Sequence, residues 1–209
     1  MFALIDDQQI TKFFSGNKGV TIGDVQYPKS IFTLWSEAER NAIGIYEVTV
    51  DTTNKKDEQW YINTNVSYGV ESNKAVGSYG TATAKAHADS TYTNQDKTDG
   101  LIPDGKDVGD IKDRGLKYNL IQTVKKQAAG ILQETDWYIT RKADAGTAVP
   151  SSITTHRAAV RTKAAEQETA IINAADTPAL ETLYTYVNTG TEENPVIERP
   201  LGELPTLDN

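Results

Sequence analysis

The chain contains no cysteine, and this absence removes several kinds of chemistry at once. Disulfides, thiolate metal sites and cysteine nucleophiles are all excluded. Histidine is almost as scarce, because His87 and His156 are the only two imidazoles and neither belongs to a pattern with an acid or a nucleophile. The serine hydrolase signature Gly-x-Ser-x-Gly is also missing. The sequence therefore predicts a protein that is not an enzyme and that binds no cofactor.

Positive charge and long apolar runs are also lacking. Lys and Arg number 21 against 29 Asp and Glu, which gives a net charge of −8. Such a chain has no electrostatic footprint for phosphate backbones, so we expect no nucleic acid partner. No apolar run approaches the length that spans a membrane, and the mean hydropathy is −0.51. The N-terminus has no basic region of a signal peptide, so we expect no membrane partner and a product that stays in the cell making it.

What is present indicates an α+β fold, which begins with a β-rich unit over residues 1–86. The capping box Ser36-Glu-Ala-Glu39 predicts one short helix, which Gly44 can end in a left-handed cap. Asn54–Asp57 is expected to be the end of a hairpin that joins two strands. Short β-prone runs flank these features at 2–5, 10–14, 20–22, 25–27, 45–50, 59–68 and 75–83.

Residues 87–112 are rich in Asp, Thr, Gly, Asn and Lys, which predicts a polar, acidic linker or long loop and a domain boundary. Aspartates recur at every third position from Asp104 to Asp113, so this segment is a chemically plausible calcium loop. It lacks the spacing and the terminal Glu of an EF-hand, and a solvated acidic linker remains the simpler interpretation. Gly100–Asp107 imitates a phosphate-binding loop but ends in Asp where Ser or Thr is needed.

The rest of the chain predicts a helical domain over residues 113–187 and an extended arm over residues 188–209. Apolar residues at helical spacing run from Leu116 to Leu132, and a second stripe follows Pro150, where Ser151 or Ser152 is the expected N-cap. Thr177, with Pro178 at the first helical position, opens a third and shorter helix. Prolines at regular intervals argue that the last segment is extended and holds no helix or strand.

Trp35, Trp60 and Trp137 could stack on sugars or bases, but each adjoins a predicted element boundary, where large aromatics usually anchor a helix or strand. Trp137 is expected to pack the end of its helix. Asp136 is expected to cap that helix or to pair with an arginine of the next, and so to lock a helical hairpin. The candidate partners are Arg141, Arg157 and Arg161.

Two blocks of the chain resemble proteins of tailed bacteriophages. Residues 34–48, with Trp35 and Arg40, are similar to a Trp-to-Gly-Ile block in small phage tail proteins. Residues 116–171, with Asp136, Trp137 and the spaced Arg157 and Arg161, resemble the helical portion of tail-fibre and baseplate-associated proteins, including those of marine cyanobacterial phages. The resemblance implies a tail component of the virion, found in the host cytoplasm during assembly.

We therefore expect a structural protein of the tail tip, the baseplate or the fibre attachment, which binds other tail or fibre proteins. A homo-oligomer is also expected, because an alanine-rich helix and an extended arm both gain partners easily. Two alternatives remain. The first is a tail-fibre assembly chaperone that is absent from the virion, and the second is a receptor module that binds carbohydrate through exposed Tyr and Trp.

Overall fold

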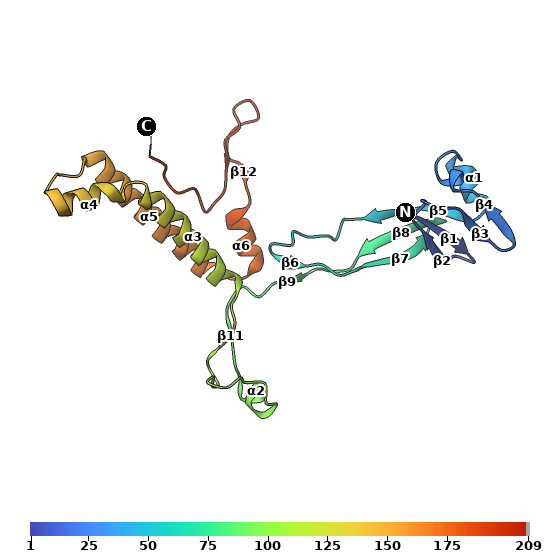
Figure 1. The fold of residues 1–209 in the computed structure, drawn as a ribbon, viewed down its shortest axis with the longest axis horizontal. Helices are drawn as coiled ribbons and strands as arrows, with labels where there is room; N and C mark the ends of the chain where they lie inside the picture. The colour runs from blue at the N-terminus through green and yellow to red at the C-terminus, as the bar shows by residue number, and fades with distance from the viewer. Residues whose placement is uncertain (208–209) are drawn as a thin grey trace. The chain divides into compact units, whose positions relative to one another are not determined.

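The computed structural model describes residues 1–207, which form two compact units, residues 1–83 and residues from Ala84 onward. The first unit is dominated by strands and the second by helices, so the protein has the predicted α+β fold (Figure 1). The boundary lies three residues before the predicted one at residue 86. No helix within residues 1–207 is long and apolar enough to cross a membrane.

The first unit contains one five-stranded sheet and several short elements. Its strands run in the order β2-β1-β5-β8-β7, in which β1 is antiparallel to β2 and β5, while β5 and β8 are parallel. The elements are β1 (Phe2–Asp6), β2 (Gln9–Phe14), β3 (Val20–Ile22), β4 (Val25–Tyr27), the 3₁₀ helix η1 (Lys29–Phe32), α1 (Glu37–Asn41), β5 (Ile45–Asp51), β6 (Tyr61–Ile62), β7 (Val66–Glu71) and β8 (Lys74–Tyr79). The two-residue strand β9 (Thr83–Ala84) lies at the boundary between the units.

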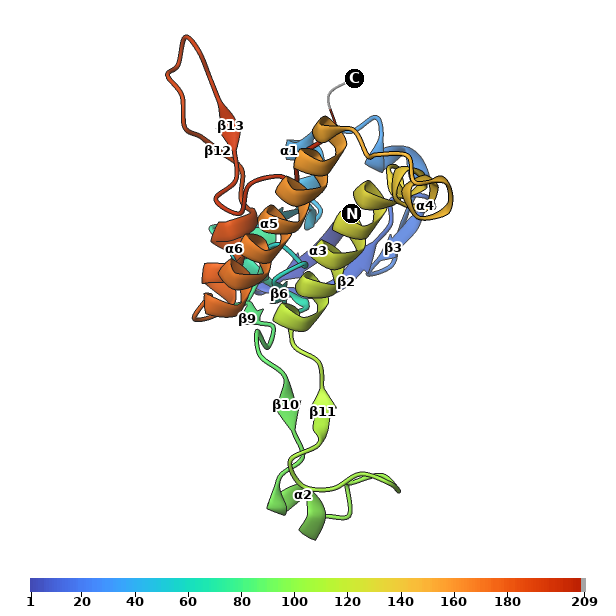
Figure 2. The ribbon, with the colours of Figure 1, turned by 90° about the vertical axis from the view of Figure 1, so that its left-hand side faces the viewer.

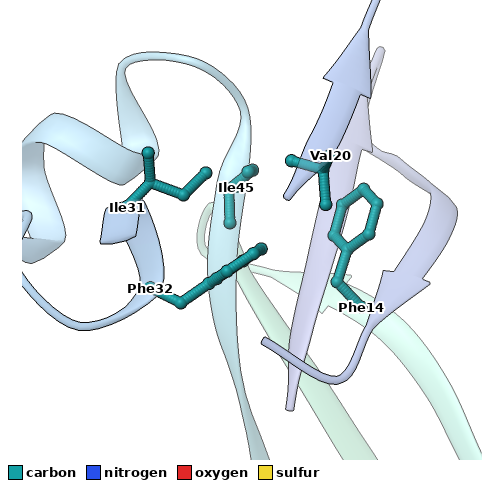
Figure 3. Close-up of a cluster of buried hydrophobic side chains, with 5 residues drawn as sticks. All are labelled: Phe14, Val20, Ile31, Phe32 and Ile45. Atoms are coloured by element: carbon teal, nitrogen blue, oxygen red, sulfur yellow. The ribbon is translucent and has the colours of Figure 1, made fainter. Parts of the chain in front are cut away.

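A small apolar core lies between this sheet and the segment that contains η1. Phe14, Val20, Ile31, Phe32 and Ile45 converge there, as Figure 3 shows. Burying each such side chain stabilises the fold by about 1.5–3 kcal/mol. These residues come from β2, β3, η1 and β5, so the core depends on four segments of the first unit meeting at one place.

The local signals around α1 are confirmed. The backbone N–H of Glu39 donates to Ser36 Oγ at 3.3 Å, and Glu39 Oε2 accepts from the Ser36 N–H at 2.7 Å. Both halves of the predicted capping box are therefore present. Gly44, three residues after the helix, has a φ of +79°, which is the left-handed conformation expected of it.

The predicted hairpin at Asn54–Asp57 is wrong. The strand before it, β5, pairs with β1 and β8. The run 59–68 is also not one strand, because it divides into β6 and β7. Asn63 explains the division, since its side-chain amide accepts from the Lys56 N–H and donates to the Lys56 carbonyl at 2.9 and 2.8 Å. These two hydrogen bonds hold Asn63 against Lys56, at a position where a continuous strand was expected.

The second unit is built on four helices. They are α3 (Leu116–Gln133), α4 (Asp136–Ala145), α5 (Ser151–Asn173) and α6 (Thr177–Tyr184). Helices α3 and α5 lie side by side and antiparallel, because Lys117 near the start of α3 donates to the Ile172 carbonyl near the end of α5, at 2.8 Å. The buried stripe of α5 includes Ile153, Val160 and Ile171, as the apolar spacing predicted.

Three details of the helices differ from the prediction. Residues 136–145 form a separate helix, α4, between the two stripes that were predicted to be helical. Helix α5 starts at Ser151 itself, so Pro150 occupies the N-cap and no side chain caps that end. The N-cap of α6 is Asp176, whose carboxylate accepts from the Ala179 N–H at 2.8 Å, so Thr177 is already the first helical residue.

The segment 87–112, predicted to be a linker, belongs to the second unit and contains three elements. They are β10 (Ser90–Thr91), α2 (Asn94–Thr98) and β11 (Ile111–Asp113). Strands β10 and β11 pair antiparallel, so the chain leaves the helices and returns to them (Figure 2). The Ala86 carbonyl closes this excursion by accepting from the Leu116 N–H at 3.0 Å.

The predicted arm, residues 188–209, also forms secondary structure within its described residues, 188–207. Strands β12 (Val187–Asn188) and β13 (Ile197–Glu198) pair as a hairpin. Leu201 is buried, and the Gln167 side-chain amide donates to the Gly202 carbonyl at 2.9 Å. The arm is therefore anchored on α5. Its last two predicted residues lie outside the described range.

Candidate functional site

Arg157 on α5 joins three helices of the second unit. Its guanidinium is buried and reaches Asp136 Oδ1 at 2.8 Å. Nη1 also donates to the Leu132 carbonyl and to Thr135 Oγ1, both at 2.6 Å. The last carbonyls of a helix have no partner within the helix, so a cation at the end of α3 both satisfies them and complements the helix dipole.

The predicted ion pair between Asp136 and an arginine of the next helix is therefore present, and the arginine is Arg157. The other two candidates have different contacts. Arg161 donates to the Arg157 carbonyl at 3.4 Å, and the Arg141 guanidinium lies over the rings of Trp137 and Tyr138. Buried carbonyl and hydroxyl groups surround Arg157, so this site positions helices.

Trp137 does not pack the helix end as predicted. It is 51% exposed, and its ring centroid lies 3.9 Å from that of Tyr138. The guanidinium of Arg141, one turn further along α4, lies 4.6 Å from the Trp137 ring and 5.5 Å from the Tyr138 ring. We call Trp137, Tyr138 and Arg141 the α4 knob. Trp, Tyr and Arg are the residues enriched in protein interfaces.

In the first unit, Trp35 and Arg40 hold the end of the α1 segment against the core. Trp35 meets Tyr27 edge to face at 6.0 Å, and Arg40 Nη1 donates to the Trp35 carbonyl. The Arg40 guanidinium also lies 5.3 Å from the Phe2 ring. Both residues therefore have a structural role in this unit. Trp60 is buried as well, which removes it as an exposed sugar-stacking residue.

Three aspartates of the 96–113 region already have partners, because Asp96 and Asp107 meet lysines and Asp110 accepts from the Asp107 N–H. Asp96 accepts from Lys112 Nζ at 2.6 Å and from the Thr93 N–H at 2.7 Å. The Lys112 ammonium, followed by the Thr93 hydrogen bonds, holds the pKa of the Asp96 carboxyl well below its usual range. No group of three or more His, Asp or Glu within residues 1–207 is arranged to hold a metal ion. The calcium interpretation gains no support from this geometry.

The phosphate-loop resemblance also finds no matching geometry. Gly100–Asp107 follows α2, whereas a phosphate-binding loop follows a strand. Asp107 points its carboxylate to Lys97 at 3.5 Å. His156 is buried on the packed face of α5, and the His87 carbonyl accepts from the Lys117 N–H at 3.0 Å. Neither imidazole lies in a group suited to metal binding within the described chain.

Two of the concave sites in the second unit are formed in part by residues of the arm. One, of about 610 Å³, runs along α3 beside the arm and is lined by Gln127, Gly130, Ile131 and Leu204 among others. The other, of about 490 Å³, lies at the base of the β12–β13 hairpin. Tyr186, Val187 and Ile197 line it and are all strongly exposed. We call this second site the hairpin cavity.

Sequence reasoning missed the hairpin cavity and the Asp96–Lys112 pair. The first was missed because the prolines of residues 188–209 suggested an arm without elements. The second had a signal in Thr93-Asn-Gln-Asp96, which has the spacing of a capping box with Asp in place of Glu. Its ion-pair partner, Lys112, lies 16 residues after Asp96 in the sequence, and no local pattern predicts a contact over that separation.

Comparison of the chain with protein-family models, with curated proteins and with solved structures finds no match. The assignment of a class therefore depends on the geometry above and on the resemblance of the two sequence blocks.

Proposed function

We propose that the chain is a structural component of the virion of a tailed bacteriophage, located at the tail tip, the baseplate or the fibre attachment. It acts by binding other proteins of the tail. The resemblance of residues 34–48 and 116–171 to phage tail proteins supports the setting. The physical argument for assembly comes from the large solvent-accessible surface area of the chain.

The chain exposes 13809 Å² of accessible surface. A single globular protein of 22.9 kDa exposes about 9,600 Å². Two separate globular units with the lengths found here would expose about 11,500 Å². The surplus over two independent globules is thus roughly 2,000 Å², which is as large as the area buried in a standard protein–protein interface. This surplus is the observation that carries the proposal.

The second unit also contains small elements that gain little stability alone. Strands β10, β11, β12 and β13 have two or three residues each, and an isolated two-stranded hairpin is marginal in water. Exposed apolar side chains lie on or beside these hairpins, including Leu101, Val187, Val196 and Ile197. Such residues are typical of segments that become buried in an assembly.

The proposal is tested by mass spectrometry of gradient-purified particles from a phage that encodes this chain. We expect peptides of the chain in the particle at a constant ratio to a tail protein, after washing that removes host cytoplasmic proteins. An assembly chaperone would instead be abundant in infected cells and absent from the particle. That result would overturn the structural role.

A further inference from the structure

The α4 knob has the properties of a binding anchor without a partner. Trp137 is half exposed, although a side chain of this size gains a large free energy from burial. Arg141 Nε is shielded from solvent and makes no hydrogen bond, and the guanidinium makes no ion pair within the described chain. Stacking on Trp137 and Tyr138 holds this guanidinium in place, so it is preorganised to bind a carboxylate.

The hairpin cavity has the complementary properties. Its volume of about 490 Å³ lies within the range of about 300–1,000 Å³ that is usual for binding pockets. Tyr186, Val187, Ile197 and Pro200 form the apolar part of its lining, which also includes the charged Glu198, Arg199 and Glu203. An empty apolar cavity lined by exposed side chains favours entry of a large aromatic group.

The charge around the cavity is opposite to that of the knob. Residues 186–203 contain four glutamates and one basic residue, Arg199. Arg199 is already paired with Glu203 at 2.7 Å. Glu198, the other glutamate that lines the cavity, accepts from Thr189 Oγ1 at 3.2 Å. The knob contributes Arg141, beside the exposed Lys142; of the two acids on α4, Asp136 is paired with Arg157 and Asp144 is exposed.

We propose that the α4 knob of one copy of this chain inserts into the hairpin cavity of a second copy. Trp137 fills the apolar cavity, and Arg141 pairs with a glutamate of the hairpin. This inference rests on the proposed assembly function and names one partner within it.

We expect the contact to be head-to-tail, with one knob in one cavity, because α4 and the β12–β13 hairpin lie in different parts of the second unit in both views (Figures 1 and 2). Each bound copy therefore still offers a free knob or a free cavity. Contacts of this kind close into rings or continue into longer arrays. One helix against one hairpin is a small interface, so we expect dissociation constants at or above the micromolar range.

The first test is sedimentation of the purified full chain at concentrations from about 1 µM to several hundred µM, the range expected for a small interface. We expect concentration-dependent association. Trp137→Ala and Ile197→Arg should each raise the dissociation constant at least about tenfold. The matched controls are Leu101→Ala, at another strongly exposed apolar residue, and Ile62→Arg, which changes an isoleucine with the same 59% exposure. The controls should associate like the wild type.

Mixing the two variants separates this contact from a symmetric one. Trp137→Ala keeps an intact cavity and Ile197→Arg keeps an intact knob, so the mixture should form one-to-one dimers and nothing larger. Circular dichroism of each variant checks that the fold is unchanged. A wild-type chain that stays monomeric, variants that associate normally, or a mixture that stays monomeric would each overturn the proposal.

The outcome for this contact is distinguishable from the outcome for the proposed function. A chain that is present in virions but does not associate with itself through these sites contradicts the contact alone. A chain that associates as described but is absent from virions contradicts the virion role alone.

Discussion

Arg157 Nη2 lies 2.8 Å from Asp136 Oδ1, and through this pair α5 holds the start of α4. The two ends of the pair are unequal, because the Arg157 side chain is 9% exposed and that of Asp136 is 57% exposed. Arg157 also donates to two groups of the α3–α4 junction, Leu132 and Thr135. The hydrogen bonds of the arginine should therefore matter more than the ion pair.

Replacing Arg157 and Asp136 separately tests this asymmetry. Arg157→Met leaves the buried Thr135 hydroxyl oxygen without its donor and the Asp136 carboxylate without its ion pair, while the Leu132 carbonyl still accepts from the Thr135 N–H at 3.1 Å. We expect a loss of about 1–3 kcal/mol in the free energy of unfolding. Asp136→Asn removes only the solvent-screened partner and should cost less than about 1 kcal/mol. Urea denaturation followed by circular dichroism at the helix band measures both. Equal losses would show that the ion pair dominates.

The Asp96–Lys112 pair predicts how the stability of residues 93–112, within the segment 87–112, depends on pH. The folded pKa of Asp96 is lowered, chiefly by Lys112 and then by Thr93, so its stabilising contribution is present above the unfolded pKa of about 3.9. It is lost as the pH falls through the lower, folded pKa. The pKa of Lys112 is raised, chiefly by its hydrogen bond to Asp96, so its contribution persists to pH values above about 10.4.

We therefore expect amide protection in residues 93–112 to be constant between about pH 5 and 9, and to fall at acid pH. Hydrogen exchange read by mass spectrometry measures it. Asp96→Asn should raise exchange in this excursion at neutral pH and leave α3 and α5 unchanged. The control is Asp104→Asn in the same excursion. If α3 and α5 lost protection as well, the excursion would not be a separate unit of stability.

Two glycines of the α3 segment should respond in opposite directions to alanine. A Cβ on Gly115 would lie 2.3 Å from the Ala88 backbone carbon, so Gly115→Ala must displace the chain and should cost about 1–3 kcal/mol. A Cβ on Gly130, within α3, meets nothing within 4 Å, so Gly130→Ala should stabilise by about 0.5–1 kcal/mol. Thermal unfolding of both variants checks the signs. A stabilised Gly115→Ala variant would contradict the close packing of Ala88.

The turn between β7 and β8 predicts a stabilising change. Ser72 and Asn73 have φ values of +50° and +59°, a conformation that costs serine more than asparagine. Ser72→Asn should raise the stability of the first unit by up to about 1 kcal/mol. It keeps the Asn73 side chain, which accepts from Gln8 Nε2 at 2.8 Å and joins the β1–β2 turn to this one. Tryptophan fluorescence during denaturation measures the change, with Gln8→Ala as a variant that should destabilise.

Features set by neighbouring residues were predictable from the sequence. The capping box of Ser36 and Glu39 and the β1–β2 turn need only groups within a few residues of each other. The stripe of α5 needs only helical periodicity. The Asp136 pair was predictable as a type of contact, because an acid and spaced arginines flank one junction. Which arginine it used was not predictable, since that depends on the direction in which α5 packs against α3.

The sequence alone determined the acidic charge, the absence of cysteine and local signals such as the capping box of Ser36 and Glu39, because composition and short-range hydrogen bonds depend on no distant partner. The tertiary structure decided that β5 pairs with β8, that residues 87–112 return to the helices, and that the β12–β13 hairpin has a cavity. Each of these depends on contacts between residues far apart in the chain. Their free energies come from burial and pairing that no local pattern records.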